Sequence, residues 1–338
     1  MFGCVGVHVS SAQRQSFSAA LPLKLIPTAM TRRVGGLLAM FVLHTAPLFA
    51  QRITAGILQA RVVVAPDTTL ILRAGDRDLL GELRVPASPG PHPVVIVIHG
   101  GCWVTKFADA RYMYPMAEAL RTNGFATWTI SYRRADEPGG GWPGTFLDVA
   151  AQTAQVRQLA RRFNLDLTRV IASGHSAGAH LALWLAAQPK LPKSSGARAG
   201  KRDPKIGAVV AIDGPGDLVG ANKGISVICG SNVLEQLLAS TPDSQPDRWR
   251  LASPSEFLPL GVPQAMVRGG LDWRLSGLGS ESGSMPVYAA RARAAGDSTW
   301  VVMSDSTSHF TMLDPQQPAF AVLLQAMKDA LQAIRVKR

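Results

Sequence analysis

The pentapeptide GHSAG at residues 174–178 constrains the fold of this chain more than any other feature. It follows an apolar run at 169–173 and precedes a stretch at 179–185 with helical spacing. A G-x-S-x-G pattern in this setting predicts a sharp strand-to-helix turn at the carboxyl end of a sheet. Such a turn exposes the serine hydroxyl, so Ser176 is a candidate nucleophile. Because the pattern also occurs by chance, the hypothesis requires a base, an acid and amide donors elsewhere in the chain.

Short apolar runs alternate with segments of helical periodicity along the rest of the chain. Strands are predicted at 93–98, 125–131, 169–173, 205–212, 263–267 and 299–303. Helices are predicted at 110–122, 145–163, 179–187, 286–295 and from Asp314 onward. This alternation indicates an α/β protein, with a mostly parallel central sheet and helices on both faces. Ligands of such sheets bind beyond the carboxyl ends of the strands.

Capping patterns predict where two of these helices begin. Thr145 and Asp148 form a Thr-x-x-Asp arrangement at the start of one helix. Asp314, followed by Pro315, predicts the start of the last helix, with the aspartate as its side-chain cap. Between two strands, residues 213–260 form a long excursion that contains proline and glycine. It is either a meandering connection or a short lid or pocket wall over the site.

The first fifty residues differ from the rest, since they hold four basic residues and no acidic one. A positive start at Met30, an apolar stretch at 34–43 and the small residue Ala50 resemble the three regions of a secretory signal peptide. We therefore expect a secreted or periplasmic protein whose single domain is 51–338, preceded by an upstream segment and the signal. The alternative is an uncleaved amino-terminal membrane anchor, although the apolar run is short for a span.

Composition favours a globular chain with a sizeable core, at 47% hydrophobic and 17% charged residues. The net charge of +12 falls to +8, from 31 basic and 23 acidic residues, without the first fifty residues. Much of that excess lies in a Ser-, Gly- and Pro-containing stretch at 189–205 that lacks aromatic residues. This composition is typical of a solvated surface loop, so we expect no nucleic-acid partner.

Two cysteines, Cys102 and Cys229, remain after the first fifty residues. In an exported protein they either form a disulfide or stay as two separate buried thiols, and spacing alone does not decide between these. The spacing fits no pattern of metal ligands, so no metal site is expected.

A loop with two glycines, HGGCW at 99–103, follows the first buried strand. Its backbone can turn amide hydrogens toward the serine, where they would stabilise the negative charge of an acyl-transfer transition state. We predict that the amides of Gly101, Cys102 and Ala177 form this oxyanion hole. His99 precedes the nucleophile by an entire fold unit, so a structural role is expected for it.

The predicted base is His309, in a polar loop between the last strand and the last helix. His175 and His180 adjoin the serine in sequence, but the turn and the helix direct them elsewhere, so packing or loop roles are expected. The predicted acid is Asp272, which follows the strand at 263–267 and can orient the imidazole. Asp213 and Asp217, after the preceding strand, are the alternatives. Substrate contacts are expected from Trp103, Trp142 and, beside the nucleophile, His175.

These motifs together resemble the esterase/lipase branch of the α/β-hydrolase superfamily, in particular its small carboxylesterase and kynurenine-formamidase-like group. The resemblance covers residues 80–338 and is carried by 99–103, 139–146, 174–182, 270–272 and 308–310. The chain departs from the family in two ways: Arg268 stands where a histidine is common, and 273–284 lengthen the segment before Pro286.

The resemblance implies a serine hydrolase that cleaves a small carboxylic ester through an acyl-enzyme, without a cofactor. Its expected partner is a small-molecule acyl substrate, with no stable membrane span after signal cleavage; the sequence does not indicate the oligomeric state. Two alternatives remain within the enzymes, an arylformamidase and a peptidase-like hydrolase. From another class, a binding protein can keep this fold without the chemistry, although an intact Ser176, Asp272 and His309 argues against it.

Overall fold

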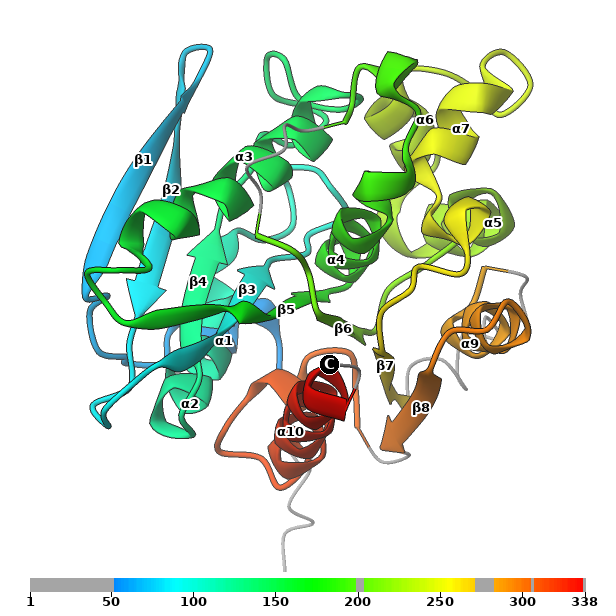
Figure 1. Ribbon diagram of the computed structural model, residues 1–338. Coiled ribbons are helices and arrows are strands. Elements are labelled where there is room, and N and C mark those ends of the chain that lie inside the picture. Colours follow the sequence, from blue (N-terminus) through cyan, green and yellow to red (C-terminus); the bar gives the residue numbers. More distant parts are fainter. Residues whose placement is uncertain (1–51, 199–203, 271–282, 305–306, 337–338) are drawn as a thin grey trace, which may run out of the picture. The chain divides into compact units, whose positions relative to one another are not determined.

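The computed structural model describes residues 52–198, 204–270, 283–304 and 307–336 (Figure 1). The chain divides into two units, Met1–Phe49 and Ala50–Arg338, and the second unit contains every described residue. Its centre is an eight-stranded sheet with the strand order β1-β2-β4-β3-β5-β6-β7-β8. The strands are β1 Thr68–Ala74, β2 Arg77–Arg84, β3 His92–Ile98, β4 Ala126–Ile130, β5 Leu165–His175, β6 Ala208–Ile212, β7 Gln264–Gly269 and β8 Thr299–Ser304.

The sheet is parallel from β4 through β8 in spatial order, whereas β1 and β2 pair antiparallel at one edge. All six predicted strands are present, and the α/β-hydrolase fold expected from the sequence is confirmed. The hairpin β1–β2 was not predicted. In β1 exposed and partly buried residues alternate, and β2 begins with two exposed residues, so the hairpin lacks the continuous apolar run that identifies a central strand.

Strand β3 shows why the sheet needs helices on both faces. Val94, Ile96 and Ile98 enter one core cluster, and Val95 and Val97 enter the other, because neighbouring side chains of a strand point to opposite faces. The first face is covered by α3 Gly144–Leu159, α4 Ala177–Ala187 and α9 Met285–Ala294 (Figure 1). The second is covered by α1 Ala55–Gln59, α2 Tyr114–Thr122 and α10 Phe320–Val336.

The predicted cap of α3 is wrong. The helix begins at Gly144, after Pro143 and without a side-chain cap. The Thr145 hydroxyl instead donates to the carbonyl of Arg133 and accepts from the amide of Gly141. Asp148 forms a buried ion pair with Arg133, whose Nε lies 2.8 Å from Oδ2. Both polar groups of the Thr-x-x-Asp pattern therefore hold the loop after β4.

The predicted start of the last helix is also wrong, since α10 begins at Phe320 and not at Asp314. Asp314 is fully buried and accepts from Nη2 of Arg61 at 2.7 Å. Its carboxylate also accepts from the amide of Gln316, which closes a turn and not a helix. The ion pair with Arg61, a residue far away in the sequence, thus decides the conformation at Asp314.

The excursion at 213–260 is mostly helical. It contains α5 Leu218–Cys229, α6 Val233–Leu238, α7 Pro246–Ala252 and the 3-10 helix η4 Pro254–Phe257. Trp249 on α7 is fully buried and donates from Nε1 to the carbonyl of Ser240 at 3.2 Å, which fixes α7 against the rest of the excursion. Within the described ranges, no helix combines the length and apolarity that a membrane span requires.

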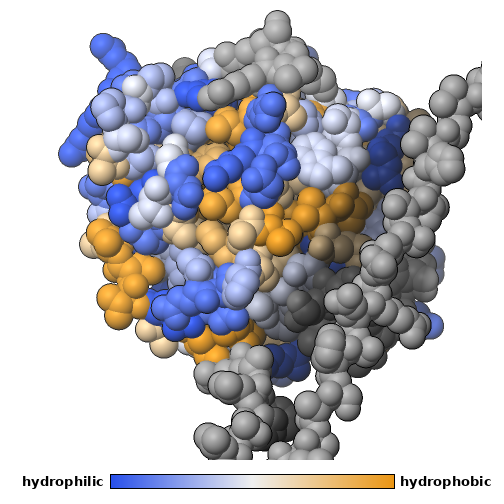
Figure 2. Space-filling model, turned by 90° about the horizontal axis from the view of Figure 1, so that it is seen from below, coloured by the Kyte–Doolittle hydropathy of each residue, from blue (hydrophilic) through white to orange (hydrophobic). Residues whose placement is uncertain are grey.

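Large apolar side chains reach the surface at scattered places along the chain. Figure 2 shows one face, on which apolar patches are interrupted by hydrophilic residues. Single exposed apolar residues of this kind are ordinary. Helix α5 differs because it carries three of them, Val219, Val227 and Ile228, with exposed fractions of 50%, 71% and 53%.

Candidate active site

Ser176 lies in the turn between β5 and α4, as the pentapeptide predicts. Its backbone is in a strained region, with φ 56° and ψ −121°. The flanking glycines are required by close contacts. A Cβ on Gly174 would lie 2.1 Å from the carbonyl oxygen of Gly178, and one on Gly178 would lie 2.2 Å from that of Ile98. The sharp turn therefore forms only because both flanking residues lack side chains.

Two further loops enclose this turn. The amide of Ser176 donates to the carbonyl of Ile212 at the end of β6, at 2.7 Å. A Cβ on Gly214 would lie 2.1 Å from the carbonyl oxygen of Ser176, and one on Gly100 would lie 2.9 Å from its Cβ. The loops that follow β3 and β6 thus pack directly against the serine, which limits the positions it can adopt.

The loop after β3, which holds two of the three predicted oxyanion donors, has an unusual backbone conformation. Three consecutive residues, Gly101, Cys102 and Trp103, have positive φ angles of 104°, 52° and 56°. Among the hydrogen bonds within the described ranges, none is donated by the amides of Gly101, Cys102 or Ala177. Within the described residues these three amides thus have no hydrogen-bond acceptor, and Cys102 and Trp103 are buried.

His309 follows β8 and lines the same cavity as Ser176. Its side chain is 26% exposed, and its Nδ1 lies 3.9 Å from Oδ2 of the fully buried Asp213. Asp213 follows β6 with a positive φ of 47°, and both of its carboxylate oxygens accept from the amide of Gly269, at 3.0 and 3.1 Å. The predicted acid Asp272 lies outside the described residues.

Asp217, the other alternative acid, is committed elsewhere. Its Oδ1 caps α5 by accepting from the amide of Gly220 at 3.0 Å. Its Oδ2 accepts from Nη1 of Arg291 on α9 at 2.7 Å. These contacts give Asp217 a structural role at the start of α5.

A cavity of about 650 Å³ opens above Ser176. Its walls come from the nucleophile turn, from the loop after β6, from α5 and from the start of α9. Apolar side chains dominate the lining: Ile53, Trp103, Pro215, Ile225, Ile228, Met285 and Phe310. Such a lining is typical of a pocket for a small organic ligand. The excursion at 213–260 therefore supplies a pocket wall.

Of the three residues predicted to contact the substrate, the structure places one in the wall of the cavity and the other two outside it. Trp103 lines the cavity, whereas neither Trp142 nor His175 does. Trp142 packs on Phe146 of α3, with ring centroids 4.9 Å apart. The segment at 52–54 also lines the cavity, and no pattern in the sequence marked it.

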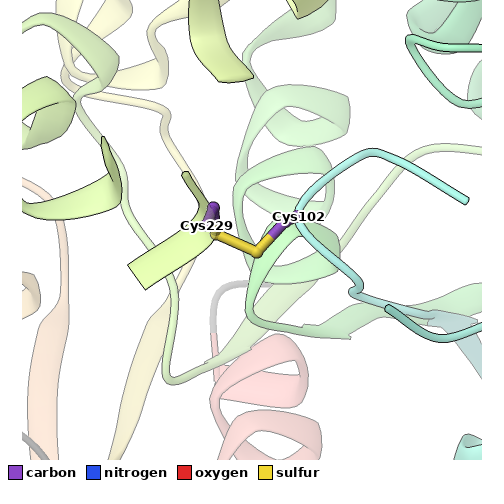
Figure 3. Close-up of a disulfide and its surroundings, with 2 residues drawn as sticks. All are labelled: Cys102 and Cys229. Atoms are coloured by element: carbon purple, nitrogen blue, oxygen red, sulfur yellow. A yellow bond between two sulfur atoms is a disulfide. The ribbon is translucent and has the colours of Figure 1, made fainter. Parts of the chain in front are cut away.

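A disulfide joins Cys102 to Cys229, with the two Cα atoms 5.7 Å apart (Figure 3). Of the two possibilities that the sequence left open, the structure has the bonded one. Cys102 belongs to the loop that carries the candidate oxyanion donors, and Cys229 is the last residue of α5. The bond therefore connects this loop to the wall of the cavity across 127 residues of sequence.

The other three histidines near the site, His99, His175 and His180, are buried, and none of them lines the cavity. Burial lowers the pKa of His99 to about 4, and burial likewise lowers the pKa of His180 to about 4. Burial, and then the neighbouring His309, hold the pKa of His175 well below its ordinary value. All three are therefore neutral at pH 7.

The side chains of His175, Asp213 and His309 offer ligand atoms within 4.8 Å of one another, which is close enough for a metal ion. His175, however, is committed to other partners. Its Nε2 lies 2.9 Å from the carbonyl oxygen of His309, and its Nδ1 lies 2.9 Å from the hydroxyl of Tyr112. A metal would have to replace one of these buried hydrogen bonds, so the group fits a metal poorly.

A family model described as BD-FAE matches residues 83–274, which is more than half of the chain. The match includes the loop at 99–103, the GHSAG turn and Asp272. Among curated proteins, Esterase LipQ of Mycobacterium tuberculosis is 32% identical over 110 residues. That alignment covers 32% of this chain and 25% of LipQ, so the chain spans about a quarter of this relative.

Solved structures share the fold. Esterase B from Lactobacillus Rhamnosis has a TM-score of 0.65 at 16% identity, over 84% of this chain and 91% of its own. The thermophilic esterase Est2 of Thermogutta terrifontis, with propionate bound, has a TM-score of 0.57 at 18% identity. That match covers 78% of this chain and 92% of Est2.

Proposed function

The chain belongs to the BD-FAE family, in the esterase/lipase branch of the α/β-hydrolase superfamily, and on this premise we propose that it is a serine hydrolase of small carboxylic esters. One observation carries the proposal. Ser176 occupies a strained positive-φ turn between β5 and α4, and His309 lines the same cavity. A strained turn persists only where its surroundings enforce it, and such turns cluster at active sites.

In the proposed reaction the Ser176 hydroxyl attacks the ester carbonyl while His309 takes its proton. The amides of Gly101, Cys102 and Ala177 donate to the oxyanion that forms. His309 then returns the proton to the leaving alcohol, and an acyl-enzyme remains. Water, activated by the same histidine, releases the acid and restores the serine. Asp272 orients His309 and stabilises its cation, and no cofactor takes part.

The size and lining of the cavity support a small substrate. About 650 Å³ accommodates a short acyl chain and a modest alcohol, and the apolar walls favour uncharged groups. Structures of Est2 contain propionate and butyrate. As part of the proposal, we expect the present chain to accept short acyl groups of this size.

Hydrolysis of p-nitrophenyl acetate and butyrate tests the proposal directly. We expect Ser176→Ala to abolish turnover and to prevent labelling by a fluorophosphonate probe, while the fold stays intact. Ser173→Ala is the matched control, because Ser173 is a buried serine of β5 whose hydroxyl has no partner in the described part of the chain. Esterase activity that survives in Ser176→Ala would falsify the assignment.

The same preparation separates the alternatives. N-formylkynurenine, short peptides and an ester chain-length series are assayed side by side. Faster turnover of the formamide indicates an arylformamidase, and faster turnover of peptides indicates a peptidase. A wild-type protein that neither reacts with the probe nor hydrolyses any substrate is a binding protein on this fold.

Export through the signal at 30–50 is also part of the proposal. The Cys102–Cys229 disulfide supports it, because disulfides persist in oxidising compartments. Fractionation of cells that express the full chain, beside a form that lacks these residues, is the test. We expect the full chain in the periplasm or medium and the shortened form in the cytoplasm. A full chain that sediments with membranes indicates the anchor.

A further inference from the structure

A chain of three hydrogen bonds, two of them buried and the third partly buried, runs behind the candidate active site. The amide of Gly100 donates to the hydroxyl oxygen of Tyr112 at 2.5 Å. That hydroxyl lies 2.9 Å from Nδ1 of His175, and Nε2 of His175 lies 2.9 Å from the backbone carbonyl oxygen of His309. The chain therefore begins next to the candidate oxyanion donors, passes the residue that precedes Ser176, and ends on the backbone of the candidate base.

The chemistry of the partners fixes the direction of every bond. A carbonyl oxygen only accepts, so Nε2 of His175 carries the proton and donates to His309. Since the imidazole is neutral, its Nδ1 has a lone pair and accepts from the Tyr112 hydroxyl. The hydroxyl oxygen in turn accepts from the Gly100 amide. Each bond therefore has one direction. In the other tautomer of His175, Nε2 would lack its proton, and two acceptors, Nε2 and the carbonyl oxygen of His309, would face each other.

Burial keeps this arrangement in a single protonation state. Tyr112 is fully buried and His175 is 1% exposed. Burial, and then the nearby His309, hold the pKa of His175 well below its usual value, and burial raises the pKa of Tyr112 above its usual value. Both groups therefore stay neutral over the pH range in which His309 has to exchange protons.

Ring contacts strengthen the same connections. The rings of His175 and His309 pack with centroids 4.3 Å apart, and the Tyr112 ring lies edge-on to His175 at 5.6 Å. A Cβ on Gly100 would lie 2.9 Å from the Tyr112 hydroxyl and 2.5 Å from the carbonyl oxygen of His175. The loop after β3 therefore packs tightly against Tyr112 and His175. The hydrogen bond from the Gly100 amide to the Tyr112 hydroxyl fixes its position.

From this geometry we propose that Tyr112 and His175 are positioning residues, which fix the loop of oxyanion donors and the backbone of His309 relative to one another. The proposal rests on the proposed function, since it concerns the same reaction. Neither residue lines the cavity, so we assign both a role in positioning and not in substrate contact. Their effect is on the geometry of the transition state, and a displacement of about 1 Å at such a site costs on the order of 100-fold in rate.

The main test is Tyr112→Phe, which removes the hydroxyl and keeps the ring in the core. We expect kcat to fall on the order of 10- to 100-fold with KM unchanged. Tyr288→Phe is the matched control, because Tyr288 is also fully buried and its hydroxyl donates to Gln264 on β7, away from these loops. The control is expected to keep the wild-type kcat, whereas a wild-type kcat in Tyr112→Phe overturns the proposal.

Two variants of His175 test whether the residues act as one unit. His175→Leu removes both hydrogen bonds, and His175→Gln keeps an amide that can donate to the His309 carbonyl. We expect the glutamine variant to recover part of the kcat lost in the leucine variant. The double variant Tyr112→Phe/His175→Leu is expected to lose no more activity than its worse single variant. If the fold-losses in kcat of the two single variants multiply in the double variant, the two residues act independently, which overturns the proposal.

A spectroscopic measurement tests the direction of the bonds without any substrate. In the ¹⁵N-labelled protein we expect His175 to be neutral at pH 7, with its proton on Nε2. A proton on Nδ1 overturns the proposal. Ser176→Ala, assayed in parallel, separates the proposed function from the positioning role. If hydrolysis requires Ser176 but not the Tyr112 hydroxyl, only the positioning role is overturned. Hydrolysis that does not need Ser176 overturns the proposed function and, with it, this role.

Discussion

Oδ2 of Asp213 lies 3.9 Å from Nδ1 of His309, a separation too long for a hydrogen bond, while both oxygens of the same carboxylate accept from the amide of Gly269. Asp213 thus links the ends of β6 and β7 and places a carboxylate near the candidate base His309. The arrangement lets Asp213 stabilise an imidazolium, but it does not orient the ring through a short hydrogen bond.

Asparagine substitutions separate the two candidate acids. We expect Asp272→Asn to lower kcat by up to about 10⁴-fold, because an orienting carboxylate is replaced by an amide that favours the wrong tautomer. Asp213→Asn is expected to cost less, since its amide oxygen still accepts from the amide of Gly269. Steady-state kinetics on p-nitrophenyl butyrate measure both. The reverse order of losses would identify Asp213 as the acid.

Loss of the disulfide is expected to destabilise the protein. In the double variant Cys102→Ala/Cys229→Ala, the free energy of unfolding should fall by about 2–5 kcal/mol, because a long loop is no longer closed in the unfolded chain. Denaturation in urea measures the change. A reductant should lower the stability of the wild type to that of the variant and leave the variant unaffected. Equal stability of the two proteins without reductant would contradict the prediction.

The turn at Ser176 is not expected to tolerate a methyl group at Gly178. In Gly178→Ala the new Cβ would lie 2.2 Å from the carbonyl oxygen of Ile98, so the turn must shift. We expect a stability loss of about 1–3 kcal/mol, together with a fall in kcat as Ser176 moves. Gly56→Ala in α1 is the control, because its Cβ meets only Thr54 Oγ1 at 3.8 Å. That substitution should be neutral or stabilising by up to about 1 kcal/mol, and wild-type behaviour of Gly178→Ala would refute the argument.

Acid is expected to unfold the protein through its buried histidines. His99 and His180 have a pKa of about 4 in the folded protein, below the ordinary value of 6.5. Above pH 6.5 these groups are neutral in both the folded and the unfolded state, so they do not make the free energy of unfolding depend on pH. Between pH 6.5 and 4 only the unfolded chain binds their protons, and each histidine lowers the free energy of unfolding by about 1.4 kcal/mol per pH unit.

Urea denaturation at several pH values measures this slope. The control is His180→Gln, whose amide can still donate to the carbonyl of Ala252, the partner of His180 Nε2 at 2.8 Å. In this variant the slope between pH 6.5 and 4 should be smaller by about 1.4 kcal/mol per pH unit. An unchanged slope would mean that His180 does not titrate as described.

Sequence patterns were sufficient where one local rule decides the structure. The apolar run at 93–98 predicted a strand that the sheet buries on both faces, and the GHSAG turn placed Ser176 between β5 and α4. The positions of Trp103 in the cavity and of His309 after β8 also followed from the order of elements. Patterns failed at Thr145 and Asp314, where the capping side chains have distant partners instead.

By itself the sequence determined the fold class, the sharp turn at Ser176 and the candidate base, because strand burial and glycine-dependent turns depend on neighbouring residues. Only the tertiary structure decided that Cys102 bonds Cys229 and that Tyr112 connects Gly100 to His175. It likewise decided that α5 walls the cavity while His175 stays behind it. These relationships join residues far apart in the chain, and distance in space is set by how the elements pack and not by local pattern.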